Sequence, residues 1–254
     1  LQGMDKSNFA WGLAACQGRR QYMEDRHAAH ISNNNDGHAV FGILDGHAGS
    51  RAADEGAHAF CSSFPPFSDD VEDNKQKIKK IFADTDETIM KQDKSGSTVA
   101  LVYLHTYCGR RYAYLSWLGD SRIMHCSKAA DDKIENGTTY YNYFTSVDHK
   151  PLLTQERIRI ENNKGSVING RVNGNLAVSR ALGDRDIKRT SPGAVIAEPD
   201  IEHCLVCKND IILIASDGFW DMVTPEVALT RINILISMFE KDDAVDNAIP
   251  NSHE

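Results

Sequence analysis

Four stretches of the chain carry the apolar patterns of β-strands. Ala39–Leu44 and Ile211–Ala215 are continuous apolar runs and Thr98–Leu104 is similar, so we expect both faces of these strands to be buried. Arg111–Leu118 alternates more between apolar and polar side chains, which indicates a strand with one covered face. The cluster Asn33–Gly37 is typical of a hairpin tip between strands, because Asn, Asp and Gly tolerate the positive φ of a tight turn.

Helical patterns lie between these strands. Val71–Gln92 carries apolar residues at helical spacing among charged ones, and Ala48–Phe60 is an Ala-rich segment that follows a strand. Thr154 is the expected cap of a helix over Gln155–Asn163, and Pro225 stands in the first turn of a later helix. Helices come in pairs between groups of strands, without strict βαβ alternation. This order predicts an α+β fold with antiparallel sheet inside and helices outside.

Composition and charge narrow the class of protein. The chain has 254 residues, 41% of them apolar and 25% charged. It has neither internal repeats nor long linkers, so we expect a single domain over residues 1–254. The net charge of −8 argues against nucleic acid as the main partner, because phosphate backbones require a basic footprint. No stretch has the roughly 18–20 uninterrupted apolar residues of a membrane span.

Cysteine usage and the first residues of the chain bear on its compartment. Six cysteines are too few for a disulfide framework. Cys204 and Cys207 have metal-ligand spacing, but no second close pair of Cys or His completes a zinc site. The N-terminus lacks the basic and apolar regions of a signal peptide. We therefore expect a cytoplasmic or nuclear protein.

Two of the most apolar strands end in the same dipeptide. Ala39–Leu44 runs into Asp45-Gly46-His47, and Ile211–Ala215 runs through a serine into Asp217-Gly218. An Asp-Gly pair alone is usually a turn. Two at the tips of central strands indicate a carboxylate site, in which glycine lets the backbone approach a ligand closely.

Further motifs make the pattern specific. The chain carries, in this order, Arg-x-x-x-Glu-Asp from Arg20, Asp-Gly-His-x-Gly, Ser-Gly-Ser-Thr, Gly-Asp-Ser-Arg, Asp-His-Lys-Pro, Val-Asn-Gly-x-Leu-Ala-Val-Ser-Arg-Ala-Leu-Gly-Asp, and Ala-Ser-Asp-Gly-x-Trp-Asp. With these motifs it resembles the metal-dependent protein phosphatases of type 2C, the PPM family, from about Phe9 to its last residue. The resemblance implies a central β-sandwich of two antiparallel sheets, flanked by pairs of α-helices, with a dinuclear metal site at one end.

The resemblance also implies which residues hold the metals. Two Mg²⁺ or Mn²⁺ ions are expected, since carboxylates, a carbonyl and waters suit hard cations. Asp45 would bridge both ions, Glu24 and the carbonyl of Gly46 would hold one, and Asp217 the other. Asp148 matches a position associated with a third, weakly held ion, although it could equally cap the turn that follows it.

Three other side chains receive roles from the same comparison. Arg20 would bind the phosphate through two parallel hydrogen bonds. His47 would protonate the departing Ser or Thr oxygen, for which a group titrating near neutrality is needed; the ordinary alternative for a histidine is packing. Arg180 falls in the family's flap, as a substrate contact or as a surface arginine.

The end of the chain departs from the family pattern, which has Asp-Asn followed by a last β-strand. One register places Asp246-Asn247 there. The register we prefer continues a helix through this point and puts Glu254 at the metal position. In both, the closing strand is absent from this sequence. Residues 127–146 are longer and more polar than their connection needs, which predicts a polar insertion loop.

The function expected from the resemblance is metal-dependent hydrolysis of phosphoserine and phosphothreonine in proteins by a metal-bound hydroxide. The partner is then a phosphorylated protein, and we expect a monomer. Two alternatives remain open. The incomplete end of the chain favours a pseudophosphatase scaffold, and the metal site would also suit a metallohydrolase of small phosphomonoesters.

Overall fold

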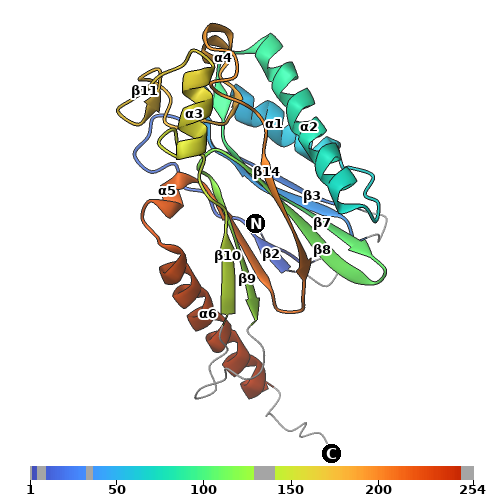
Figure 1. The fold of residues 1–254 in the computed structure, drawn as a ribbon. Coiled ribbons are helices and arrows are strands. Elements are labelled where there is room, and N and C mark those ends of the chain that lie inside the picture. Colours follow the sequence, from blue (N-terminus) through green and yellow to red (C-terminus); the bar gives the residue numbers. More distant parts are fainter. Residues whose placement is uncertain (1, 5–9, 33–36, 129–140, 247–254) are drawn as a thin grey trace, which may run out of the picture.

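The computed structural model describes residues 2–4, 10–32, 37–128 and 141–246, and two antiparallel sheets lie at its centre (Figure 1). The strands of the larger sheet are β3 (Arg26–Ile31), β4 (Ala39–Leu44), β7 (Val99–Tyr107), β8 (Arg110–Leu118) and β14 (Asp200–Val206). Those of the smaller sheet are β9 (Arg122–Lys128), β10 (Tyr141–Thr145) and β15 (Ile211–Ala215). The strand orders are β14-β8-β7-β4-β3 and β10-β9-β15.

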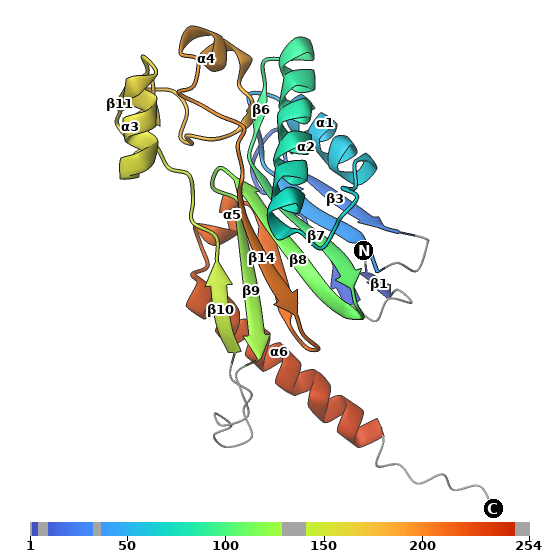
Figure 2. The same ribbon diagram turned by 45° about the vertical axis from the view of Figure 1, so that its right-hand side comes forward.

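Helices cover the outer faces of both sheets (Figure 2). The pair α1 (Arg51–Ser62) and α2 (Val71–Gln92) packs on the larger sheet, where Phe60 and Phe82 join the same buried cluster as Tyr103. The short α5 (Asp217–Trp220) and the long α6 (Pro225–Asp246) lie beside the smaller sheet. The expected α+β sandwich with flanking helices is therefore confirmed.

Both faces of strand β7 are buried, which explains why its sequence is apolar without alternation. Val99, Leu101 and Tyr103 face α1 and α2, whereas Ala100 and Val102 face the smaller sheet. All five are at most 1% exposed. Successive side chains of a strand point to opposite faces, and both faces of β7 are covered. Each large side chain buried in this way contributes about 1.5–3 kcal/mol.

Strand β15 was also expected to have both faces buried, but it does not. Its five residues, Ile211–Ala215, are all only partly buried, so the prediction of two buried faces is wrong for this strand. In the described part of the chain β15 is hydrogen-bonded only to β9, at the edge of the smaller sheet. An edge strand has one open side, which leaves its side chains within reach of solvent.

Two local predictions also need correction. Helix α3 begins at Thr154 and ends at Asn162, so Leu153 takes the capping position and Thr154 does not cap the helix. The range 127–146 is not all loop, because β10 lies within it and pairs with β9 from Tyr141 opposite Lys128 to Thr145 opposite Met124. Strands β3 and β4, on either side of Asn33–Gly37, pair antiparallel with Ile31 opposite Ala39; residues 33–36, on which the predicted hairpin tip falls, lie outside the described part.

Residues 154–196 form a small unit with its own buried cluster, which includes Ile160, Val178 and Val195. Its elements are α3, β11 (Val167–Ile168), β12 (Arg171–Val172), β13 (Leu182–Gly183) and α4 (Arg185–Thr190). Strand β13 extends a second three-stranded sheet, β13-β6-β5, in which β6 is Gly96–Ser97 and β5 is Gly46–His47. This sheet connects the unit to the tip of β4. No helix among the described residues is long and apolar enough to cross a membrane.

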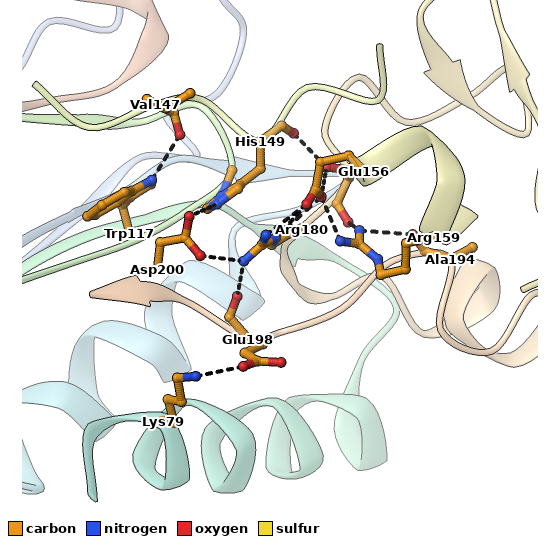
Figure 3. A network of polar contacts seen from close by, with 12 residues as sticks. Lys79, Trp117, Val147, His149, Glu156, Arg159, Arg180, Ala194, Glu198 and Asp200 are labelled. Atoms are coloured by element: carbon orange, nitrogen blue, oxygen red, sulfur yellow. Dashed lines mark hydrogen bonds and ion pairs between the residues drawn. The ribbon is translucent and has the colours of Figure 1, made fainter. Parts of the chain in front are cut away.

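An ionic network centred on the buried Glu156 holds this unit to the sandwich (Figure 3). Glu156 of α3 accepts a hydrogen bond from Nη2 of Arg180 at 2.7 Å and pairs with Nη1 of Arg159 at 2.8 Å. Arg180 also donates to Asp200 at 2.8 Å, and Asp200 lies 3.3 Å from Nε2 of the buried His149. The guanidinium of Arg180 is therefore engaged by protein carboxylates, and its side chain is only 16% exposed, so the surface-arginine interpretation is wrong.

Candidate active site

Asp45 follows the last residue of β4 and is held rigidly by its main chain. Its carbonyl oxygen accepts hydrogen bonds from the backbone N–H of Thr98 at 2.9 Å and from Oγ of Ser97 at 3.2 Å. Thr98 in turn shares a 2.6 Å hydrogen bond with Ser121. The buried strand and these bonds fix where the Asp45 side chain begins, which is a requirement for a binding carboxylate.

Carboxylates from distant parts of the chain gather at Asp45. Burial, the negative charges of Asp25 and Asp217, a hydrogen bond with the Asp217 side chain and the charge of Asp120 together raise the pKa of Asp45 to about 8. Asp217 begins α5 just after β15, and the preceding Ser216 donates a hydrogen bond to Asp25 at 3.1 Å. The two strand tips predicted to form one site therefore do meet.

Glu24 and Gly46 are brought to the same place by close backbone packing. A side-chain oxygen of Glu24 accepts a hydrogen bond from the N–H of Gly49 at 2.7 Å. Any Cβ on residue 46 would lie only 2.6 Å from the Glu24 carbonyl oxygen. Glycine is therefore required at this position, as the motif suggested.

The donor set fits hard divalent cations. Burial and then the nearby like charges raise the pKa of the Asp45 carboxyl, and a bound cation would offset the repulsion between these charges. The gathered donors are oxygens, which favour Mg²⁺ or Mn²⁺ over zinc. Within the described residues no group of three or more His, Cys, Asp or Glu side chains encloses an ion by itself. Backbone carbonyls and water would have to complete the coordination.

Asp120 and Asp148 occupy different environments. Asp120 is 5% exposed and forms an ion pair with Lys150, and its pKa is raised, first by burial and then by the charges of Asp217 and Asp148, despite this partner. Both carboxylate oxygens of Asp148 accept hydrogen bonds from Arg122, at 2.5 and 2.9 Å. The Asp148 side chain is thus used by a guanidinium and does not cap its turn. Asp120 faces the cluster more directly.

His47 lies beside the cluster, on β5. Its Nε2 is 2.9 Å from both carboxylate oxygens of Asp184. Burial alone would lower the pKa of His47, but the hydrogen bond and the charge of Asp184, with Asp120 and Glu24 behind it, outweigh burial and raise the pKa. The imidazole is therefore stabilised in its protonated form next to the carboxylates.

Arg20 lies on the loop that precedes β3 and is exposed. The side-chain amide of Gln17 donates to the carbonyl oxygens of Arg20 at 2.8 Å and Gln21 at 3.2 Å, which holds the loop backbone. No hydrogen bond or ion pair between the Arg20 guanidinium and the carboxylate cluster is found in the described residues. The structure thus leaves the predicted phosphate contact untested.

Comparison with known proteins agrees with this geometry. A family model described as Protein phosphatase 2C matches residues 9–245. The chain belongs to the protein phosphatase 2C family. It is 33% identical over 241 residues to a probable protein phosphatase 2C of Arabidopsis thaliana, covering 91% of this chain and 60% of that protein. It is also 33% identical to protein phosphatase 1B of Rattus norvegicus, covering 95% of this chain and 64% of the relative.

Solved structures show the same fold. A phosphatase from a pathogenic strain of Toxoplasma gondii aligns with a TM-score of 0.65 at 24% identity, over 80% of this phosphatase 2C chain and 74% of that one. A Caenorhabditis elegans sex-determining protein aligns with a TM-score of 0.62 at 26% identity, over 82% of this chain and 51% of the other. The chain thus spans only part of the length of several of its relatives.

Sequence reasoning missed two residues of this site and named two outside the described part. Asp120 and Asp184 stand inside the quoted Gly-Asp-Ser-Arg and Ala-Leu-Gly-Asp motifs, and each is a buried acid. The signal available in the sequence was an aspartate directly after a glycine in each of these two motifs. Glu254 and Asn247 lie outside the described residues, and nothing is described of the side chain of Asp246, so the register of the chain end stays a prediction.

Proposed function

We propose that this protein hydrolyses phosphoserine and phosphothreonine in proteins, using Mg²⁺ or Mn²⁺ held at the tips of β4 and β15. The observation that supports the proposal most directly is the convergence of Asp45 and Asp217 from the tips of two strands; burial, together with the neighbouring charges of Asp25 and Asp217, raises the pKa of Asp45 to about 8. Members of the family are generally Mg²⁺- or Mn²⁺-dependent. When bound, two such ions supply positive charge and an acidified water for attack on phosphorus.

The proposed roles follow the chemistry of each residue. Asp45, Asp217, Glu24 and the Gly46 carbonyl would hold two cations by their oxygens. Asp148 and Glu254 remain candidates for further coordination, although Arg122 already occupies Asp148. Asp120 also has a basic partner, Lys150, but it is the stronger candidate because its charge reaches Asp45.

The substrate would be held and cleaved by two further side chains. Arg20 would bind the phosphate dianion through its planar guanidinium. His47 would donate a proton to the departing serine or threonine oxygen. A monomer in the cytosol or nucleus, acting on phosphoproteins, completes the proposal.

The test compares turnover of a phosphothreonine peptide with and without Mn²⁺. We expect turnover that EDTA abolishes and that Asp45→Asn lowers by at least about 10²-fold, as when a metal ligand's charge is lost. The matched control is Asp84→Asn on α2, whose side chain is 60% exposed; it should behave as the unsubstituted protein. A calorimetric Mn²⁺ titration gives a readout besides activity, and Asp45→Asn should weaken the binding.

The outcomes separate the alternatives. Turnover that is undiminished in excess EDTA would contradict the metal-dependent mechanism. Mn²⁺ binding without turnover of any phosphoester would indicate a scaffold. Preference for small phosphorylated metabolites over phosphopeptides would indicate the wrong substrate class.

A further inference from the structure

A small sheet places His47 and Asp184 on either side of one glycine. In the order β13-β6-β5, Gly96 of the middle strand pairs with His47 on one side and with Gly183 on the other. Asp184 follows Gly183 directly. Its carboxylate reaches across the middle strand to Nε2 of His47, at 2.9 Å from both oxygens. Residues 137 positions apart are thus joined by backbone pairing as well as by the side-chain contact.

Gly96 leaves the space that this contact needs. A Cβ on residue 96 would come under 3.0 Å from Nε2 of His47 and from Oδ2 of Asp184. Side-chain ends usually move away from an added methyl group. The His47 ring and the Asp184 carboxylate are hydrogen-bonded to each other, however, so moving away would break their contact. Because glycine has no Cβ, the histidine and the aspartate can contact each other at this position.

Asp184 is held in a conformation that costs energy. Its φ is 53° and its ψ is 40°, which is the left-handed region, and a non-glycine residue there costs on the order of 1–3 kcal/mol. Its backbone N–H donates to Ser95 O at 3.0 Å, and the N–H of Gly183 donates to Asp86 at 2.6 Å. Asp184 is only 6% exposed. The surrounding bonds thus hold the strained residue in place.

The ordinary explanation for Asp184 does not apply. An aspartate just before a helix usually caps it through its side chain. Asp184 stands before α4, but its side chain makes no capping hydrogen bond. The carboxylate is turned away from the helix and toward the imidazole.

We infer that Asp184 is a positioning residue that fixes the ring of His47 through Nε2, so that Nδ1 delivers the proton to the leaving oxygen. This inference rests on the proposed function. As the phosphorus–oxygen bond breaks, the Nδ1 proton passes to the departing serine or threonine oxygen, which leaves as the alcohol. The neutral imidazole keeps its Nε2–H bond to Asp184 and regains the Nδ1 proton from water. An aspartate in this relation to a histidine sets its tautomer and orientation.

The kinetic test uses Asp184→Asn, because Asn tolerates the left-handed region and keeps the side-chain size. We expect kcat on a phosphothreonine peptide to fall about tenfold or more, which is a part of the roughly 10²–10⁴-fold that general acid–base catalysis contributes. With para-nitrophenyl phosphate, whose leaving group needs little protonation, kcat should stay within about twofold. In a His47→Gln background Asp184→Asn should add no further loss. The control is Asp186→Asn, two residues along, whose side chain is 70% exposed.

A spectroscopic test is independent of turnover. The Nε2-bound proton of His47 should give a hydrogen-bonded NMR signal, assigned by its disappearance in His47→Gln. Asp184→Asn should shift or abolish it, and Asp186→Asn should leave it unchanged. If the unsubstituted protein lacks an Nε2-bound proton on His47, the inference is overturned even if the protein is an active phosphatase.

The kinetic results can also overturn it. Equal losses on both substrates, or losses that multiply in the double variant, would show that Asp184 does not act through His47. A folded protein without phosphatase activity would instead refute the proposed function, and the NMR signal would still decide the Asp184–His47 contact.

Discussion

Glu156 allows a quantitative prediction about stability. The residue is 3% exposed and contacts Arg180, Arg159 and Ser179. Burial alone would raise its pKa, but the hydrogen bonds from Arg180 and Ser179 and the two positive charges outweigh burial and lower the pKa from 4.5 to about 2. This lowering of the pKa corresponds to roughly 3 kcal/mol of stability at neutral pH.

The perturbation is Glu156→Gln, which removes the charge and keeps the shape. Arg180 retains Asp200 at 2.8 Å and the Glu198 carbonyl at 3.0 Å, so part of the network survives. We expect the free energy of unfolding at pH 7 to fall by about 3 kcal/mol, near the lower end for breaking a buried ion pair. Denaturant unfolding followed by circular dichroism measures it.

The lowered pKa of Glu156 determines how the stability difference between the two proteins changes with pH. The folded pKa of Glu156 lies below its unfolded value, so its contribution is complete above about pH 4.5 and is lost as the pH falls toward 2. At about pH 3, which lies between the folded and unfolded pKa values, the difference in free energy of unfolding between the two proteins should therefore be less than half of its value at pH 7.

The control is Glu161→Gln on the same helix. Its pair with Arg157 has a 2.8 Å separation, but the side chains are 55% and 48% exposed, and such pairs contribute under about 1 kcal/mol. If Glu156→Gln costs no more than Glu161→Gln, or if its cost does not shrink in acid, the buried network does not stabilise the fold as argued.

Three further predictions follow from single contacts. Arg20→Lys should raise KM for phosphopeptides and leave Mn²⁺ affinity unchanged, because a point charge cannot make two parallel hydrogen bonds; a change in calorimetric metal affinity alone would contradict the assignment. Gly183→Ala should lower the free energy of unfolding by at least about 2 kcal/mol, since φ is +71° and a Cβ would meet the Ser95 carbonyl oxygen; an unchanged denaturation midpoint would refute this. Gly96→Ala should lower the turnover of a phosphothreonine peptide more than that of para-nitrophenyl phosphate, as expected for Asp184→Asn, because a Cβ there would separate His47 from Asp184; normal turnover of the peptide would contradict this argument.

Elements with long, unambiguous patterns could be predicted from the sequence. Val71–Gln92 and Ala39–Leu44 have the predicted bounds, because the helical spacing of the first and the continuous apolar run of the second agree with the layers that bury them. The burial of Ile211–Ala215 could not be read from its composition, because it depends on how many strands flank it. Similarly, Leu153 rather than Thr154 precedes α3, which local sequence preference alone did not decide.

The chemistry of single site residues could be predicted from the sequence, but the long-range contacts between them could not. Asp45 and Asp217 each ended an apolar strand, so their chemistry was visible, but their meeting depends on the packing of β4 against β15. The Asp184–His47 contact joins residues 137 positions apart. The Glu156–Arg180 pair likewise depends on the fold of residues 154–196, and a sequence pattern for exposed arginine looks the same as one for buried arginine.

The unit formed by residues 154–196 must be held firmly against the sandwich to keep Asp184 beside His47. The unit places Asp184 within hydrogen-bonding distance of His47. The left-handed backbone of Asp184 would relax if the unit could move away from β6. Several independent bonds oppose this movement: Ser95 to Asp184, Asp86 to Gly183 and Lys188, and Glu156 to Arg180. Each is worth roughly 0.5–3 kcal/mol, so together they offset the backbone cost at Asp184. The charges that hold the unit thus lie outside the carboxylate cluster, which leaves Asp45 and Asp217 available for the cations proposed above.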